Sequence, residues 1–246
     1  MTGPWWEGPL WTYDTETTGT DPEHDRLVTL CLDHYDHPDA TTPTDSLRLV
    51  IDPGVPIPET AAAVHGYDNQ RATTEGITPI DALLQLEEAL AAVTATLTPV
   101  VVYNAVFDLT LTDREMRRHL HRPLALQFPV IDPLVIDRRV DRYVKGSGQR
   151  KLQPTATRYG VTLTDWHTAE ADAYAALSIA RRIGHKHQGT LPDDLRDLWR
   201  WQAAARREQA TDLQTYLARV GRTNDDGTPI TIPTDWPMCP YTGDAE

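Results

Sequence analysis

The chain has 246 residues, of which 40% are hydrophobic and 24% charged, and its formal net charge is −13. This length suits one sizeable globular domain with an appendage, and the composition excludes wholesale disorder. The negative charge argues against a protein whose main task is to coat nucleic acid, but not against an enzyme that meets phosphates through bound cations. Because the chain lacks a secretion signal, a stretch that could cross a bilayer and more than two cysteines, we expect a cytoplasmic protein without membrane association or a disulfide framework.

Strand signals come first along the chain. Apolar and β-prone residues bracketed by Gly, Pro and Asp predict strands over residues 10–17, 26–33 and 47–51. A short helix is expected over 58–64 and a longer one over 80–96, where apolar residues follow helical spacing. A continuous apolar strand over 99–103 then leads through a turn at 104–107 into the next helix.

The second half of the chain alternates a strand with helices. We expect a strand over 129–132, a short helix over 151–159 and a long helix over 169–187. The long helix has a small-residue face that can approach the sheet closely, made of Ala169, Ala173, Ala176 and Ala180. A last helix is predicted after Gly189, with Thr190 as its N-cap. Its core-facing side is expected to be Leu213, Tyr216, Leu217 and Val220.

This order of elements predicts an α/β fold in which a mixed β-sheet is flanked by helices, with a C-terminal helical extension. We divide the chain into a main domain at 1–189, a C-terminal helix packed on it at 190–221, and a tail rich in Pro, Asp and Thr at 222–246. Three tryptophans of the last two parts, Trp199, Trp201 and Trp236, either cover the core or mark a partner surface.

Acidic residues recur where the predicted elements begin or end. Asp14 and Glu16 share one face of the first strand, because side chains repeat every second residue along a strand. Asp108 lies near the start of one helix and Asp172 near the start of another, with His167 just before it. Charges at the end of a buried strand are costly unless they bind a cation. Four carboxylates and a histidine therefore predict a site that holds two divalent cations and activates a water.

Each piece alone has an ordinary structural explanation. Surface strands often carry two acids, and Asp108 beside Phe107 can be a helix cap next to a core aromatic. His167 can be a structural histidine and Asp172 an ordinary helix acid. The ordered conjunction of the three segments favours a metal site over these explanations.

A basic segment precedes the third acidic segment. Residues 138–158 hold a single acid, Asp141, and a flexible Gly146-Ser147-Gly148 run. The cations of the segment are Arg138, Arg139, Arg142, Lys145, Arg150, Lys151 and Arg158. The segment is either a rim that guides a nucleic-acid strand or a solvated loop and helix face, and the sequence does not decide between them.

Taken together, Asp14-Thr15-Glu16, Asn104-Ala105-Val106-Phe107-Asp108 and His167-Thr168-Ala169-Glu170-Ala171-Asp172 resemble the DEDD exonucleases of the histidine subtype. That family includes the epsilon subunit of bacterial DNA polymerase III and ribonuclease T. The resemblance covers roughly the first three quarters of the chain, and Tyr103 stands where many relatives have His. It implies a ribonuclease H-like fold and a 3′-to-5′ exonuclease that hydrolyses single-stranded DNA to nucleoside 5′-monophosphates.

The same resemblance assigns roles to residues. Two Mg²⁺ or Mn²⁺ ions, about 3.5 to 4 Å apart, would be clamped by carboxylates, with Asp14 bridging them. The metal ligands would be Asp14, Glu16, Asp108 and Asp172, and the catalytic set would add His167 as general base. The terminal nucleotide would be contacted by Thr17, His65 and Phe107, whose ordinary explanations are a turn hydroxyl, a surface histidine and a core aromatic.

Two alternatives to a DNA exonuclease stay open at this point. An RNA-trimming 3′-to-5′ exoribonuclease uses the same residues, because the choice of sugar depends on contacts to the 2′-hydroxyl. A catalytically silent nucleic-acid-binding module of the same fold would not need all five catalytic residues, yet all five are present. The C-terminal residues do not resemble the polymerase-binding tail of the epsilon subunit, so no polymerase partner is predicted, and the sequence leaves the oligomeric state undecided.

Overall fold

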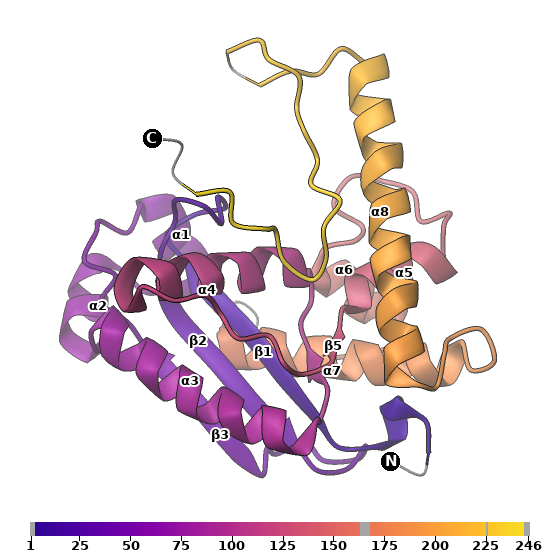
Figure 1. Cartoon of the computed structure of the whole chain (residues 1–246), viewed down its shortest axis with the longest axis horizontal. Helices are drawn as coiled ribbons and strands as arrows, with labels where there is room; N and C mark the ends of the chain where they lie inside the picture. The colour runs from indigo at the N-terminus through magenta and orange to yellow at the C-terminus, as the bar shows by residue number, and fades with distance from the viewer. Residues whose placement is uncertain (1–2, 163–167, 225, 244–246) are drawn as a thin grey trace.

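The computed structural model describes residues 3–162, 168–224 and 226–243 of the chain. A five-stranded sheet lies between helices on both of its faces (Figure 1). In chain order the elements are η1 (Trp5–Glu7), β1 (Leu10–Thr17), β2 (Leu27–Tyr35), β3 (Asp45–Val50), α1 (Glu59–His65), α2 (Asn69–Glu75), α3 (Pro79–Thr96), β4 (Val100–Val101), α4 (Ala105–Leu120), β5 (Val130–Ile131), α5 (Pro133–Val140), α6 (Leu152–Arg158), α7 (Ala169–Lys186) and α8 (Leu195–Arg219).

The sheet is mixed, with strand order β3-β2-β1-β4-β5. β1 pairs antiparallel with β2 and parallel with β4, while β2–β3 is antiparallel and β4–β5 parallel. Helices α3 and α4 cover one core, and α7, α6 and α5 cover the other. The expected α/β architecture with a mixed sheet, flanking helices and a C-terminal helix is confirmed.

The central strand β1 holds helices on both faces because its side chains alternate. On one face, the Tyr13 hydroxyl lies 2.8 Å from the Thr112 hydroxyl of α4. On the other, the Thr12 hydroxyl donates to the Ala173 carbonyl oxygen of α7 at 2.7 Å. Ala173 is fully buried, as the small-residue face of α7 predicts. The strand therefore brings the starts of α4 and α7 to one end of the sheet.

Two strands are shorter than the sequence predicts. β4 and β5 pair over two residues each, although the apolar run of β4 continues with Val102 and Tyr103. The pairing stops because Asn104 takes a left-handed conformation (φ 67°) and turns the chain into α4. Its backbone N–H, like that of Ala105, donates to the Asp132 carboxylate instead, at 3.1 and 3.0 Å. Asp132 also caps α5, a helix that the sequence analysis missed together with η1 and α2.

Helix α8 differs from its prediction in both its start and its face. It begins at Leu195 with Asp194, not Thr190, as N-cap, because the Asp194 carboxylate accepts the N–H groups of the first turn. The side chains that it buries are Leu198, Gln202, Ala205 and Ala210, in its first two thirds. The predicted core-facing side was wrong, since Leu213, Tyr216 and Val220 are 38, 51 and 48% exposed. The last turns run past the body of the protein (Figure 1).

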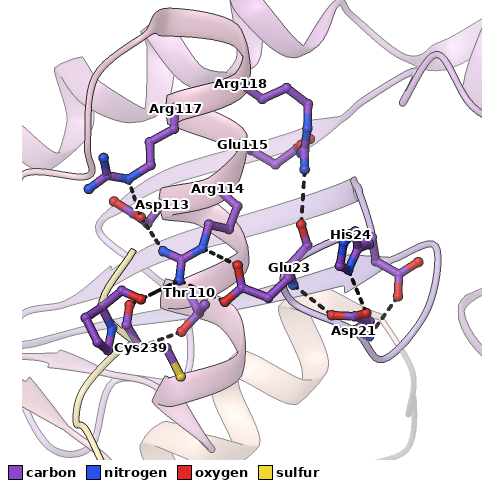
Figure 2. Close-up of polar contacts among 12 residues, drawn as sticks. Asp21, Glu23, His24, Thr110, Asp113, Arg114, Glu115, Arg117, Arg118 and Cys239 are labelled. Atoms are coloured by element: carbon purple, nitrogen blue, oxygen red, sulfur yellow. Dashed lines mark hydrogen bonds and ion pairs between the residues drawn. The ribbon is translucent and has the colours of Figure 1, made fainter. Parts of the chain in front are cut away.

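The tail after α8 returns to the main body and crosses α4. Trp236 packs edge-on against Trp199 of α8, with ring centroids 4.8 Å apart, and both rings contact the core beneath α3 and α4. The Cys239 backbone N–H donates to the Thr110 hydroxyl at 2.9 Å, and Arg114 donates to the Cys239 carbonyl oxygen at 3.3 Å (Figure 2). Trp199 and Trp236 thus cover the core, as one of the two explanations predicted.

Both cysteines, Cys31 and Cys239, are free. Within the described ranges, the helices are all too short or too polar to span a membrane.

Candidate active site

Three carboxylates meet where the end of β1 faces the start of α7. One oxygen each of Asp14, Glu16 and Asp172 lies within 4.8 Å of the other two. The strand provides the first two because residues two apart share a face. Asp172 is fixed in the first turn of α7, where its N–H donates to the Thr168 carbonyl oxygen at 3.0 Å. The Thr168 hydroxyl caps the helix by accepting the Ala171 N–H at 3.2 Å.

The fourth carboxylate, Asp108, reaches the same end of the sheet from α4. It lies in the first turn of that helix and is 4% exposed. Its Oδ1 accepts a hydrogen bond from the Thr15 hydroxyl at 2.6 Å. Thr15 stands between Asp14 and Glu16 in β1 and points to the opposite face. One segment of β1 therefore positions all four carboxylates. It carries Asp14 and Glu16 itself, holds Asp108 through Thr15, and packs against α7, which carries Asp172.

Three of the site carboxylates have raised pKa values. Burial, reinforced by Asp108, Asp172 and Glu16, raises the pKa of Asp14 well above its usual range. Burial and then the charge of Asp172 raise the pKa of Glu16 to about 8. Burial raises the pKa of Asp108 to about 7, although the hydrogen bond from Thr15 opposes the shift.

In the described part of the chain, neither arginine nor lysine forms an ion pair with Asp14, Glu16 or Asp108. Buried carboxylates of this kind must hold either protons or a cation. Converging carboxylate oxygens are the ligands that Mg²⁺ and Mn²⁺ prefer. The donor set therefore fits a divalent-metal site.

The three residues expected to contact a nucleotide differ in their surroundings. His65 ends α1 and is 5% exposed, so the ordinary explanation of a surface histidine does not hold. Burial lowers its pKa, which the nearby Thr17 backbone opposes. The Thr17 hydroxyl is engaged in its own turn, donating to the Gly19 carbonyl oxygen at 2.6 Å. Phe107 is half-buried against the core next to Asp108. Their contact with a nucleotide stays a prediction.

The two ring nitrogens of His65 differ in their hydrogen bonding. Its Nδ1 accepts the Tyr67 backbone N–H at 3.2 Å, so Nε2 carries the proton of the neutral ring. Nε2 is buried and no atom of residues 3–162, 168–224 and 226–243 makes a close hydrogen bond with it, although the Thr17 backbone is near enough to the ring to oppose the lowering of its pKa. A buried donor without a close partner is destabilising, so this one is suited to a ligand atom.

His167, the expected general base, lies outside the described residues. Three supporting residues were not singled out by the sequence analysis: Thr15, Asp132 and Glu170. Thr15 orients Asp108, and Glu170 adds negative charge that raises the pKa of Glu16. Asp132 was recognisable in principle, since Asp followed by Pro133 is an N-cap signal. Thr15 and Glu170 have no comparable local signal.

Comparison with known proteins places this geometry in context. A family model described as Exonuclease (RNase_T) matches residues 12–180, a span that includes Asp14, Glu16, Asp108 and Asp172. No curated protein matches the sequence. Among solved structures, Exonuclease I from Methylocaldum szegediense is 23% identical with a TM-score of 0.58, over 85% of this chain and 46% of that one. E. coli Exonuclease I with single-stranded DNA and zinc is 19% identical with a TM-score of 0.59, over 75% and 42%.

A product-bound exonuclease I gives a TM-score of 0.60 at 18% identity, over 73% of this chain and 44% of that chain. At such identities the likeness establishes the fold alone, which is the expected ribonuclease H-like one. The matches also cover less than half of each of these solved chains.

Proposed function

We propose that the chain, which belongs to the RNase_T exonuclease family, degrades single-stranded DNA from the 3′ end. Members of that family are 3′-to-5′ exonucleases of the DEDD type that hydrolyse phosphodiester bonds. Its products would be nucleoside 5′-monophosphates. The observation that carries the proposal is the convergence of Asp14, Glu16 and Asp172 within 4.8 Å, without an arginine or lysine paired to the first two in the described ranges.

The carboxylates would hold two divalent cations, Mg²⁺ or Mn²⁺. Asp14, Glu16 and Asp172 would share one ion, and Asp14 with Asp108 would hold the other. When bound, the ions would neutralise the charge of the scissile phosphodiester and activate a water. The raised pKa values of Glu16 and Asp108 suit this role, because a cation replaces the protons that these groups otherwise hold.

The remaining residues would position the strand and move the proton. Thr15 keeps one Asp108 oxygen fixed through its 2.6 Å hydrogen bond, which leaves the other oxygen for a ligand. The Nε2–H of His65 would donate to the terminal nucleotide, with Thr17 and Phe107 beside it. His167 would take the proton from the attacking water, as the general base.

Incubation with labelled oligonucleotides tests the proposal. Single-stranded DNA and RNA of one sequence, labelled at the 5′ end, are incubated with Mg²⁺, Mn²⁺ or a chelator. Stepwise shortening from the 3′ end that requires metal and is faster on DNA is the expected result. Faster shortening of RNA would make the protein an RNA-trimming enzyme. Binding of both strands without cleavage would instead indicate a silent module.

A further inference from the structure

A second feature of the molecule is a cavity of about 510 Å³ between the segment that joins α5 to α6 and the C-terminal half of α8. In Figure 1 that segment runs beside α8. On one side the cavity is lined by Arg138, Arg142, Arg150 and Lys151, and on the other by Gln209 and Asp212. Four cations therefore face one acid. The basic segment noted in the sequence forms a wall rather than a flat surface.

The charge of this wall is only partly neutralised. The buried carboxylate of Asp137 is shared by two guanidinium groups, those of Arg150 and Arg158. The exposed Glu208 carboxylate lies 3.6 Å from Arg142 and 3.5 Å from Arg139. Exposed pairs of this kind are weak and readily exchanged for other anions. Positive charge is thus concentrated here in a chain whose net charge is −13.

An exposed aromatic residue lies between two of the lining residues in the sequence. Tyr143 is 86% exposed, the largest value among the exposed large hydrophobic residues in the described ranges. Its neighbours on either side, Arg142 and Val144, both line the cavity. An exposed aromatic ring beside a basic groove is the arrangement on which unpaired bases stack while cations follow the backbone. A duplex, whose bases are already stacked, would not use it in this way.

The wall of the cavity is connected to the carboxylate site. The Tyr103 hydroxyl donates to the Arg150 carbonyl oxygen at 2.7 Å. Tyr103 immediately precedes Asn104, the residue that starts α4 and so positions Asp108. Asp132 links the same point to α5, because its carboxylate caps both the start of α4 and the start of α5, which carries Arg138. A strand leaving the carboxylates along this side would meet the cavity.

We propose that the cavity and Tyr143 bind single-stranded nucleic acid upstream of its 3′ end, with phosphates among the cations and an unpaired base on the tyrosine ring. This inference rests on the proposed function, since it assumes that the 3′ end lies at the carboxylates. It assigns the basic segment to strand guidance, one of the two interpretations left open by the sequence.

Two variants test the inference: the double substitution Arg142→Glu with Lys151→Glu, and Tyr143→Ala. All three side chains are exposed, so the fold should tolerate these changes. The matched control is Arg196→Glu with Arg200→Glu, which makes the same change in charge at the other end of α8. The substrates are a long single-stranded oligonucleotide and the p-nitrophenyl ester of a nucleoside 5′-monophosphate, which occupies the carboxylate site alone.

If the cavity binds the strand, the variants should lose more activity on a long strand than on a substrate that occupies the carboxylate site alone. For the double variant, KM on the oligonucleotide should rise by about tenfold or more, and the logarithmic salt slope of binding should become shallower by about 1.4 for two lost cations. Tyr143→Ala should weaken oligonucleotide binding by about fivefold or more. Hydrolysis of the ester should change far less in both variants than oligonucleotide degradation.

Two results would overturn the inference. One is an equal loss on the ester and the oligonucleotide, which would indicate damage to the carboxylate site. The other is an oligonucleotide KM in the double variant no higher than in the control. Failure of the proposed function is separable, because it would appear as absence of ester hydrolysis in the unmodified protein. Binding of a fluorescent oligonucleotide by anisotropy, in chelator, would still decide whether the cavity holds the strand.

Discussion

Two groups of acids each include a buried carboxylate of α4, Asp108 in one and Asp113 in the other, and among the described residues arginine pairs with Asp113 but not with Asp108. The first is the set of site carboxylates, Asp14, Glu16, Asp108 and Asp172. The second is what we call the α4 ion cluster, in which Glu23, Asp113 and Glu115 face Arg114, Arg117 and Arg118 (Figure 2). Asp108 and Asp113 are similarly buried, at 4 and 1% exposure. Burial alone therefore does not distinguish the two groups.

The α4 ion cluster satisfies its carboxylates with guanidinium groups. Asp113 accepts from Arg114 at 2.6 Å and from Arg117 at 2.8 Å, while its other oxygen accepts the Leu124 N–H at 3.0 Å. Arg114 also makes a two-pronged contact with Glu23, at 2.6 and 2.8 Å. Such paired geometry is typical of strong charge-assisted hydrogen bonds. The cluster ties the loop after β1, and through Arg114 the C-terminal tail, to α4.

The partners of a buried carboxylate, more than its burial, separate structural from functional acids in this molecule. Where the fold brings arginines to a buried carboxylate, the carboxylate can serve structure. Where carboxylates converge, they repel one another, and the raised pKa of Glu16, caused by burial and then by the charges of Asp172 and Asp108, includes that cost. Breaking the first group should change stability, and breaking the second should change activity.

The largest expected effect is on activity. Asp14→Asn should lower exonuclease turnover by about 1,000-fold or more, because it removes a ligand on which several kcal/mol of transition-state stabilisation depends. The fold should survive, since the change removes a buried like charge. Turnover is measured on 5′-labelled single-stranded DNA and folding by circular dichroism. Full activity in the variant would refute the assignment of the site.

The opposite pattern is expected of Arg114→Ala. This change leaves Asp113 buried and short of one partner, and frees Glu23 and the tail carbonyl oxygens. Removing one member of a buried ion pair costs about 3 to 5 kcal/mol. Urea unfolding should show that loss, while the folded fraction keeps its turnover. A variant of unchanged stability would show that the α4 ion cluster is dispensable.

A smaller effect is expected on the pH dependence of stability without metal. Glu16 has a pKa of about 8 when folded and an ordinary value of 4.5, so between these values the folded protein binds more protons than the unfolded chain. Its contribution is favourable at low pH and is lost as the pH rises toward 8. In chelator, the stability of the Glu16→Gln variant relative to the unmodified protein should therefore increase as the pH rises from about 5 to about 8.

The gain should be visible as a relative increase in Tm of about 2 to 4 °C for each kcal/mol in a chain of this size. Adding Mg²⁺ should raise the Tm of the unmodified protein more at the higher pH, where the cation displaces fewer protons. A Tm difference between the two proteins that does not change with pH would contradict the assigned shift.

The smallest effect is expected for Glu23→Gln. Glu23 belongs to the α4 ion cluster, but its side chain is 45% exposed. Water can take over its role, and an exposed ion pair contributes about 0.2 to 1 kcal/mol. Thermal unfolding should show a loss within that range, well below that of Arg114→Ala. A loss as large as for Arg114→Ala would mean that Glu23, rather than Asp113, is the partner that matters.

Much of the site was predictable because its signals are local. The bounds of β1 agree with the prediction, since its apolar residues are bracketed by a turn, and alternation places Asp14 beside Glu16. Asp108 and Asp172 lie in first turns of helices, as their sequence positions indicate. What the sequence could not indicate is which buried acids are neutralised from a distance. Glu23 and Arg114 are 91 residues apart, and no periodicity connects them.

The apolar face predicted for the end of α8 failed for a related reason. Helical spacing of Leu213, Tyr216 and Val220 shows that a face exists, but not that a neighbour covers it. The tail bonds to Gln214 of these turns but leaves Leu213, Tyr216 and Val220 exposed. It then crosses α4, where Trp236 and Cys239 find their partners. Tertiary packing, not local pattern, decides such cases.

Metal binding is the most direct test of the claim that Asp14, Glu16, Asp108 and Asp172 hold divalent cations. Calorimetric titration with Mn²⁺, in two buffers of different ionisation enthalpy, would measure affinity and proton release together. We predict binding to the unmodified protein with release of protons, and an affinity at least about tenfold lower in Asp14→Asn. Mn²⁺ binding that is absent from the unmodified protein, or equally tight in Asp14→Asn, would contradict the account.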